Sequence, residues 1–209
     1  MRLLIIGATR GIGRQTAQQA LAQGHEVTVL ARRPEKINLE HQRLLVRAGD
    51  ILDPVSVSQS MVGQEAVLVT VGLPPTWQPV SVFSQGIKNV LSAMGQHGVA
   101  RLLAVTGIGA GDSKGHGGFF YDRIFNPLLL KRIYEDKDRE EAIIKESQVQ
   151  WTIVRPGFLT NGPLTGRYRV IIDLTGITCG KISRADVAHF LLQEVAANRY
   201  VYQTPLLTY

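Results

Sequence analysis

Residues 7–13 read GATRGIG, and they follow an apolar run, RLLIIG, at 2–7. The run predicts a buried strand, and three glycines within seven residues predict a tight turn that leads into a helix. Such a turn exposes free backbone N–H groups at the positive end of the helix dipole, which makes an anion site. Glycine also lets a pyrophosphate approach the backbone closely. The stretch therefore predicts a βαβ unit that binds a dinucleotide.

The rest of the chain alternates between strand-like and helix-like segments. Strands are predicted at 2–7, 25–32, 43–50, 65–72, 100–107 and 149–156. Helices are predicted at 9–24, after Asp53-Pro54, and at 79–98, 128–147 and 183–197. This alternation predicts an α/β fold, a Rossmann-type doubly wound parallel sheet covered on both faces. We expect residues 1–209 to form a single domain, with 157–182 as a small substrate-side segment and 107–118 as a mobile glycine-rich loop.

Composition narrows the function classes. The single cysteine allows no internal disulfide, the five histidines are scattered, and no metal site is expected. With no signal-like or membrane-spanning run, we expect a cytoplasmic protein that does not enter a membrane. The net charge of +6 is concentrated before Asp50, around the glycine turn. A small phosphorylated ligand explains this placement better than nucleic acid does, because no basic stripe has interleaved aromatic residues.

The end of the second predicted strand distinguishes between the two nicotinamide cofactors. An enzyme that uses NAD places Asp or Glu there to bind the ribose 2′-hydroxyl. This chain has LARRPEK at 30–36, with Arg32 and Arg33 and no acid at that point. Two guanidinium groups can bind a 2′-phosphate, and Arg10 can approach it from the glycine turn. The sequence therefore favours NADP(H) over NAD(H).

Ligands of this fold bind beyond the carboxyl ends of the strands. We expect Asp50 and Ile51 beside the adenine, Val71 and Gly72 near the adenosine ribose, and Thr106 near the nicotinamide. The full set of expected cofactor-binding residues is Gly7, Thr9, Arg10, Gly11, Ile12, Gly13, Arg32, Arg33, Asp50, Ile51, Val71, Gly72, Thr106, Pro156 and Gly157.

Several stretches together resemble an atypical short-chain dehydrogenase/reductase of the NAD(P)H-binding group. They are GATRGIG (7–13), VTVLARR (27–33), GDILDP (49–54), AVLVTVG (66–72), WTIVRPG (151–157), GPLTGRYRV (162–170) and ISRADVAHFLL (182–192). The last two are similar to the flavin reductase/biliverdin reductase B branch, and NmrA-like redox sensors belong to the same group. The resemblance implies hydride transfer from NADPH to a flat, conjugated acceptor such as a flavin or a linear tetrapyrrole, by a monomeric protein.

The sequence departs from the usual Ser, Tyr and Lys of short-chain dehydrogenases. Lys137 matches the family lysine, but the tyrosine position four residues earlier is Ile133, and Tyr134 is displaced by about 100° around the helix. Thr106-Gly107 stands where the branch has Thr-Ser. We expect Thr106 and Lys137 at the nicotinamide end, with Tyr121 from the following loop as a substitute proton donor.

Three functions follow from these observations. The first is an NADPH-dependent reductase of a planar small-molecule acceptor, because a flavin takes hydride at a ring nitrogen and can take its proton from water. The second is a non-catalytic NADP(H) sensor of the NmrA type, which the missing tyrosine and serine favour. The third is a relative of the sugar-nucleotide epimerases, which requires a Tyr-x-x-x-Lys pair that the chain lacks.

Overall fold

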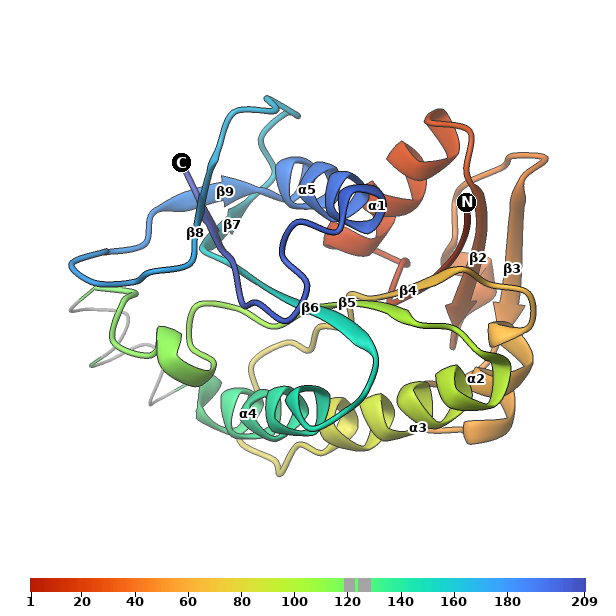
Figure 1. Cartoon of the computed structure of the whole chain (residues 1–209), viewed down its shortest axis with the longest axis horizontal. Coiled ribbons are helices and arrows are strands. Elements are labelled where there is room, and N and C mark those ends of the chain that lie inside the picture. Colours follow the sequence, from red (N-terminus) through yellow and green to blue (C-terminus); the bar gives the residue numbers. More distant parts are fainter. Residues whose placement is uncertain (119–122, 124–128) are drawn as a thin grey trace.

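The computed structural model describes residues 1–118, 123 and 129–209. Its central sheet has eight strands in the order β3-β2-β1-β4-β5-β6-β10-β8 (Figure 1). The strands are β1 (Arg2–Ile6), β2 (Glu26–Ala31), β3 (Leu44–Ala48), β4 (Ala66–Val69), β5 (Arg101–Val105), β6 (Gln150–Pro156), β8 (Arg169–Ile171) and β10 (Leu206–Thr208). The first six are parallel, and the order reverses between β1 and β4. The predicted Rossmann-type doubly wound sheet is confirmed.

Helices cover both faces of the sheet. Figure 1 shows α1 (Gly11–Ala22) and α5 (Arg184–Ala197) on one face. The other face carries α2 (Pro54–Met61), α3 (Val82–His97) and α4 (Lys131–Lys145). Each face has its own apolar layer against the sheet. α1 buries one apolar face against the sheet, with Ile12, Ala17, Ala20 and Leu21.

The helices begin and end where local chemistry favours it. The Asp53 carboxylate accepts hydrogen bonds from the N–H groups of Val55 and Ser56, and Pro54 opens α2. Ser183 caps α5 by accepting from the N–H of Asp186 at 3.0 Å. α3 is capped from outside, because Asp136 of α4 accepts from the N–H groups of Phe83 and Ser84.

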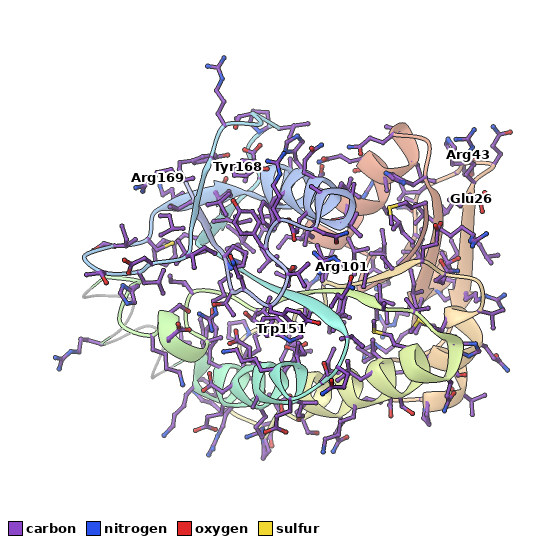
Figure 2. All side chains as sticks on the ribbon, in the orientation of Figure 1. Glu26, Arg43, Arg101, Trp151, Tyr168 and Arg169 are labelled. Carbon is purple, nitrogen blue, oxygen red and sulfur yellow. The ribbon has the colours of Figure 1, made fainter. Side chains whose placement is uncertain are left out.

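Figure 2 shows how the interior is filled. Trp151 is 7% exposed and belongs to the apolar layer. Arg101 at the start of β5 is also buried, and its Nη2 lies 2.7 Å from Glu194 Oε1 of α5. Glu26 and Arg43 lie on the surface near the amino ends of β2 and β3. The ion pair of Arg101 with Glu194 holds the amino edge of the sheet to α5. The opposite edge, where the strands have their carboxyl ends, is left to form a site.

The carboxyl-terminal part contains strands that the sequence did not predict. β10 pairs with β6 in parallel and with β8 in antiparallel, so the sheet is not parallel throughout. β7 (Phe158–Thr160) and β9 (Lys181–Ser183) form a separate two-stranded sheet. Within the described part of the chain, no helix has the length and apolarity needed to cross a membrane.

Candidate functional site

The glycine turn connects β1 to α1 at the carboxyl edge of the sheet. Gly7 has φ +100°, and a Cβ on this residue would lie 2.8 Å from the backbone carbon of Thr70. A Cβ on Gly13 would overlap both Thr70 Oγ1 and the carbonyl oxygen of Gly7. The turn is therefore packed against the end of β4 so closely that only glycine fits at both positions.

The first turn of α1 is available to an anion. Its N-cap residue, Arg10, is exposed and makes no side-chain capping hydrogen bond, and the turn contains no acidic side chain. Thr9 is half-buried, whereas Ile12 is buried and packs into the core beneath the helix. Uncapped N–H groups at a positive helix end fit a pyrophosphate.

Arg32 and Arg33 lie where the sequence placed them, directly after β2, and both are exposed. Among the described residues neither arginine forms an ion pair with a carboxylate, and no acidic residue follows β2 at this point before Glu35. The chemistry of this edge fits a phosphate group better than a ribose hydroxyl.

Asp50 and Ile51 follow β3 and have different surroundings. Asp50 is half-buried, and its Oδ1 accepts from the N–H of Leu52 at 3.0 Å. Ile51 is 6% exposed and packs against Gly86 of α3, while its carbonyl accepts from Asn89 Nδ2. Asp50 lies at the carboxyl edge of the sheet, whereas the side chain of Ile51 forms part of the core.

The remaining strand ends complete the edge. Val71 is half-buried and Gly72 is exposed, two and three residues beyond the end of β4. Pro156 and Gly157 are buried at the end of β6, and a Cβ on Gly157 would overlap Cys179 Sγ and the carbonyl oxygen of Gly180. Gly157 therefore lets Cys179 and Gly180, which precede β9, pack against the end of β6, which gives it a structural role in addition to its position at the edge.

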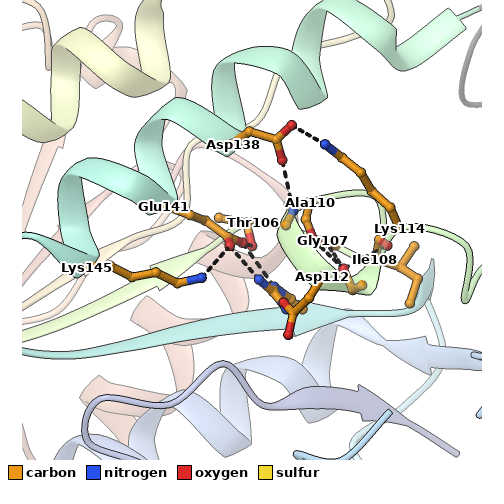
Figure 3. A network of polar contacts seen from close by, with 12 residues as sticks. Thr106, Gly107, Ile108, Ala110, Asp112, Lys114, Asp138, Glu141 and Lys145 are labelled. Atoms are coloured by element: carbon orange, nitrogen blue, oxygen red, sulfur yellow. Dashed lines mark hydrogen bonds and ion pairs between the residues drawn. The ribbon is translucent and has the colours of Figure 1, made fainter. Parts of the chain in front are cut away.

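Thr106 follows β5 and is only 8% exposed. Its hydroxyl donates to Glu141 Oε1 of α4 at 2.7 Å, as Figure 3 shows. The same carboxylate accepts from Arg155 Nε at 3.0 Å and from Arg155 Nη2 at 2.5 Å. The proton of Thr106 is thus directed into a buried ionic network rather than toward the carboxyl edge of the sheet, where we expected Thr106 to lie near the nicotinamide.

Lys137 also reaches the end of β5, but from inside the protein. Its ammonium donates to the carbonyl of Val105 at 3.0 Å, lies 3.5 Å from Glu140 Oε2, and sits 4.1 Å above the ring of Phe83. The residue is 5% exposed. Burial raises the pKa of Glu140, and the charge of Lys137 opposes that rise. Lys137 supports the end of β5 through the backbone of Val105.

Sequence reasoning missed the position of Tyr134. Although it does not occupy the usual tyrosine position, a Cβ on Gly109 would lie 2.7 Å from its ring, and a Cβ on Gly107 would lie 2.9 Å from its hydroxyl oxygen. Ile133, at the usual position, is buried against Val80 and Phe83. The two glycines after β5 were the signal, because they make room for a ring. Tyr121 lies outside the described residues.

The loop after β5 makes polar contacts with α4 and β6, and the mobility expected of 107–118 stays a prediction. The Asp138 carboxylate accepts from the N–H of Gly111 at 2.8 Å and pairs with Lys114, while Asp112 pairs with Arg155 (Figure 3). The Ser113 hydroxyl is buried and donates to the carbonyl of Ile108 at 2.8 Å. Side chains of α4 and β6 therefore hold the described part of this loop.

The same loop contacts the segment 157–182. His116 Nδ1 lies 2.8 Å from the carbonyl of Ile177, and the carbonyl of His116 accepts from the N–H of Cys179. His116 is half-buried. The contact joins the predicted substrate-side segment to the loop after β5.

Comparisons with known proteins agree with this geometry. A family model described as NAD(P)H-binding matches residues 7–198. An uncharacterised chloroplastic protein of Arabidopsis thaliana is 27% identical over 96% of this chain and 75% of its own length. An uncharacterised sugar epimerase of Bacillus subtilis, YhfK, is 28% identical over 90% of this chain and 85% of its own. The cytoplasmic location expected from the sequence stays a prediction.

Solved structures show the same fold. ChuY of Escherichia coli O157:H7, described as an anaerobillin reductase, superposes with a TM-score of 0.82 at 24% identity, covering 100% of this chain and 97% of ChuY. A short-chain dehydrogenase/reductase of Veillonella parvula in complex with NADP gives a TM-score of 0.82 at 18% identity, covering 100% of this chain and 94% of that one.

Proposed function

Because this chain belongs to the NAD(P)H-binding family, we propose that it is an NADPH-dependent reductase that transfers hydride to a planar conjugated acceptor. The proposal is supported by two features of the carboxyl edge of the sheet. The helix after the glycine turn begins without a side-chain cap, and two exposed arginines follow β2 that form no ion pair with a carboxylate among the described residues. When bound, NADPH supplies the hydride; the chain supplies position, charge and exclusion of water.

Different groups along this edge hold different parts of the cofactor. The N–H groups at the start of α1 bind the pyrophosphate, Arg32 and Arg33 bind the 2′-phosphate, and Asp50 lies beside the adenine. The backbone after Thr106 and the ends of β4 and β6 line the rest. Lys137 holds the end of β5 in place from behind, through the carbonyl of Val105.

The arrangement of possible proton donors favours a particular class of acceptor. The hydroxyl of Thr106 is bonded to Glu141, the ammonium of Lys137 is bonded to Val105, and Ile133 replaces the usual tyrosine. A carbonyl substrate needs a proton donor as hydride arrives, whereas a flavin or a linear tetrapyrrole can accept hydride within its conjugated system and take its proton from water. ChuY, which shares the fold, is described as an anaerobillin reductase, and its reported activity is consistent with this class of acceptor.

The same observations favour a second candidate. A protein whose buried Thr106 and Lys137 only support the backbone can bind NADP(H) without turnover, and then acts as a sensor of the NmrA type. The epimerase relative in Bacillus subtilis is a weaker guide, because an epimerase of this fold needs the tyrosine that Ile133 replaces.

A titration separates the two candidates. NADPH and NADH are titrated against the protein, and FMN, riboflavin, a quinone and biliverdin are then added while absorbance at the NADPH band is followed. We expect selective NADPH binding and loss of absorbance with at least one planar acceptor. Tight binding without loss for every acceptor contradicts the reductase and supports the sensor.

A further inference from the structure

A hollow of about 280 Å³ opens between α1 and α5, next to the glycine turn. One wall is the outer face of the first turns of α1, and the opposite wall is the start of α5 with the residues after β7. The residues that line the hollow include Gly11, Arg14, Gln15, Asn161, Gly162 and Arg184. None of the residues that line the hollow is acidic.

The charge of this hollow is not balanced by the protein. Arg14 and Arg184 both line it, and neither forms an ion pair with a carboxylate within the described ranges. The arginines of the interior differ, since Arg101 pairs with Glu194 and Arg155 pairs with Glu141. Two like charges that share a hollow repel each other unless an anion lies between them.

The orientation of Arg184 is fixed. Its Nη1 donates to Asn161 Oδ1 at 2.9 Å, and its Nε lies 3.8 Å from the position of a Cβ on Gly11. The guanidinium therefore reaches from the first residue of α5 across to the first residue of α1. A guanidinium held by one bond keeps its other N–H groups for a ligand, and bidentate contact with a carboxylate or phosphate suits its planar geometry.

The location of the hollow separates it from the expected 2′-phosphate site. Arg32 and Arg33 follow β2, whereas the hollow is bounded by α5 and by residues 161–162, which belong to the segment 157–182. That segment is the one expected on the acceptor's side. We propose that the hollow binds the anionic group of the acceptor, a carboxylate or a phosphate, through Arg14 and Arg184. This proposal rests on the reductase proposed above.

Pairs of acceptors that differ only in their anion test this assignment. FMN carries a phosphate that riboflavin lacks, and biliverdin carries carboxylates that its dimethyl ester lacks. Arg14→Gln, Arg184→Gln and the double variant are compared with Arg199→Gln, which removes an exposed arginine beyond the other end of α5. Thermal unfolding verifies that each variant folds, and the two single variants test the hollow independently.

Loss of two charge-assisted contacts predicts that the double variant raises KM for the anionic member of a pair by about tenfold or more. We expect KM for the uncharged member and Kd for NADPH to change by less than about twofold, because neither binds through these guanidinium groups. A rise with FMN identifies phosphate as the anion, and a rise with biliverdin identifies carboxylate. Arg199→Gln should match the parent protein.

Binding without turnover provides the second readout. Quenching of flavin fluorescence measures FMN and riboflavin binding to the protein saturated with NADP⁺. If no acceptor is reduced but FMN binding still depends on Arg14 and Arg184, the result supports the anion site and contradicts the proposed reductase activity. Equal weakening of FMN and riboflavin overturns the anion site, and so does a comparable weakening of NADPH, which would assign the hollow to the cofactor.

Discussion

The guanidinium of Arg155 and the carboxylate of Glu141 meet in the interior, with Nη2 2.5 Å from Oε2 and Nε 3.0 Å from Oε1. The pair joins β6 to α4, and Thr106 and Asp112 extend it to both ends of the turn after β5. Burial by itself lowers the pKa of Arg155, but the hydrogen bonds and charges of Glu141 and Asp112 raise it. The position of Thr106 and of the turn after β5, where we expect the nicotinamide, therefore depends on a buried ion pair.

Glu141→Gln tests this dependence. The substitution keeps the shape of the side chain but leaves the charge of Arg155 without its main partner, so the free energy of unfolding should fall by about 3–5 kcal/mol. Urea denaturation measures the loss. Glu135→Gln, which removes the exposed partner of Arg132 on the same helix, should cost about 0–1 kcal/mol. Similar losses in the two variants contradict a buried network.

Arg32→Ala with Arg33→Ala tests cofactor choice. Two charge-assisted contacts to a phosphate should be lost, which weakens NADPH binding by roughly 2–4 kcal/mol, while NADH, which lacks that phosphate, binds almost as before. Isothermal titration gives both values. Arg43→Ala is the matched control, because Arg43 is exposed near the amino end of β3 and donates to the carbonyl of Gly24. Equal effects on NADPH and NADH would show that these arginines do not bind the 2′-phosphate.

Gly13→Ala tests the packing of the turn. Its new methyl group would overlap Thr70 Oγ1 and the carbonyl of Gly7, so the start of α1 must move away from the ends of β1 and β4. We expect a loss of about 2–3 kcal/mol in the free energy of unfolding, with loss of NADPH binding. Gly95→Ala in α3 meets nothing within 4 Å and should stabilise the protein by about 0.5–1 kcal/mol. If Gly13→Ala leaves NADPH affinity unchanged, the pyrophosphate does not bind this turn.

Lys137→Met tests whether this lysine supports β5. It leaves the carboxylate of Glu140 buried without a partner, at a cost of about 3–5 kcal/mol at neutral pH. The pKa of Glu140 is already raised by burial above its ordinary value of 4.5, and loss of Lys137 raises it further. A raised carboxyl pKa means that the folded state holds its proton more tightly. The loss should therefore shrink as the pH falls through that raised pKa.

The double variant Lys137→Met with Glu140→Met is the control for this prediction. An apolar pair of similar volume should recover most of the lost stability, because neither charge then remains buried without its partner. If the double variant is stable and still reduces an acceptor, Lys137 has a supporting role only. If it is stable but inactive while NADPH affinity is unchanged, the ammonium takes part in the reaction.

The sequence by itself determined the fold and the location of the cofactor edge. GATRGIG after an apolar strand, and strands alternating with helices, are local signals, because glycine spacing and hydrophobic periodicity depend on neighbours in the chain. They predict the glycine turn and place Arg32 and Arg33 at the end of the second strand, without an acid beside them.

Only the tertiary structure decided what the polar side chains around that edge do. Thr106 and Lys137 have the residue types of a catalytic site, but contacts with Glu141 and Val105, from other elements, direct them inward. Arg14 and Arg184 are 170 positions apart, and they line one hollow because α1 packs against α5. The short strand β10 pairs with β6 only because the sheet is already formed. Such contacts between distant segments depend on the packed fold, which local sequence patterns do not encode.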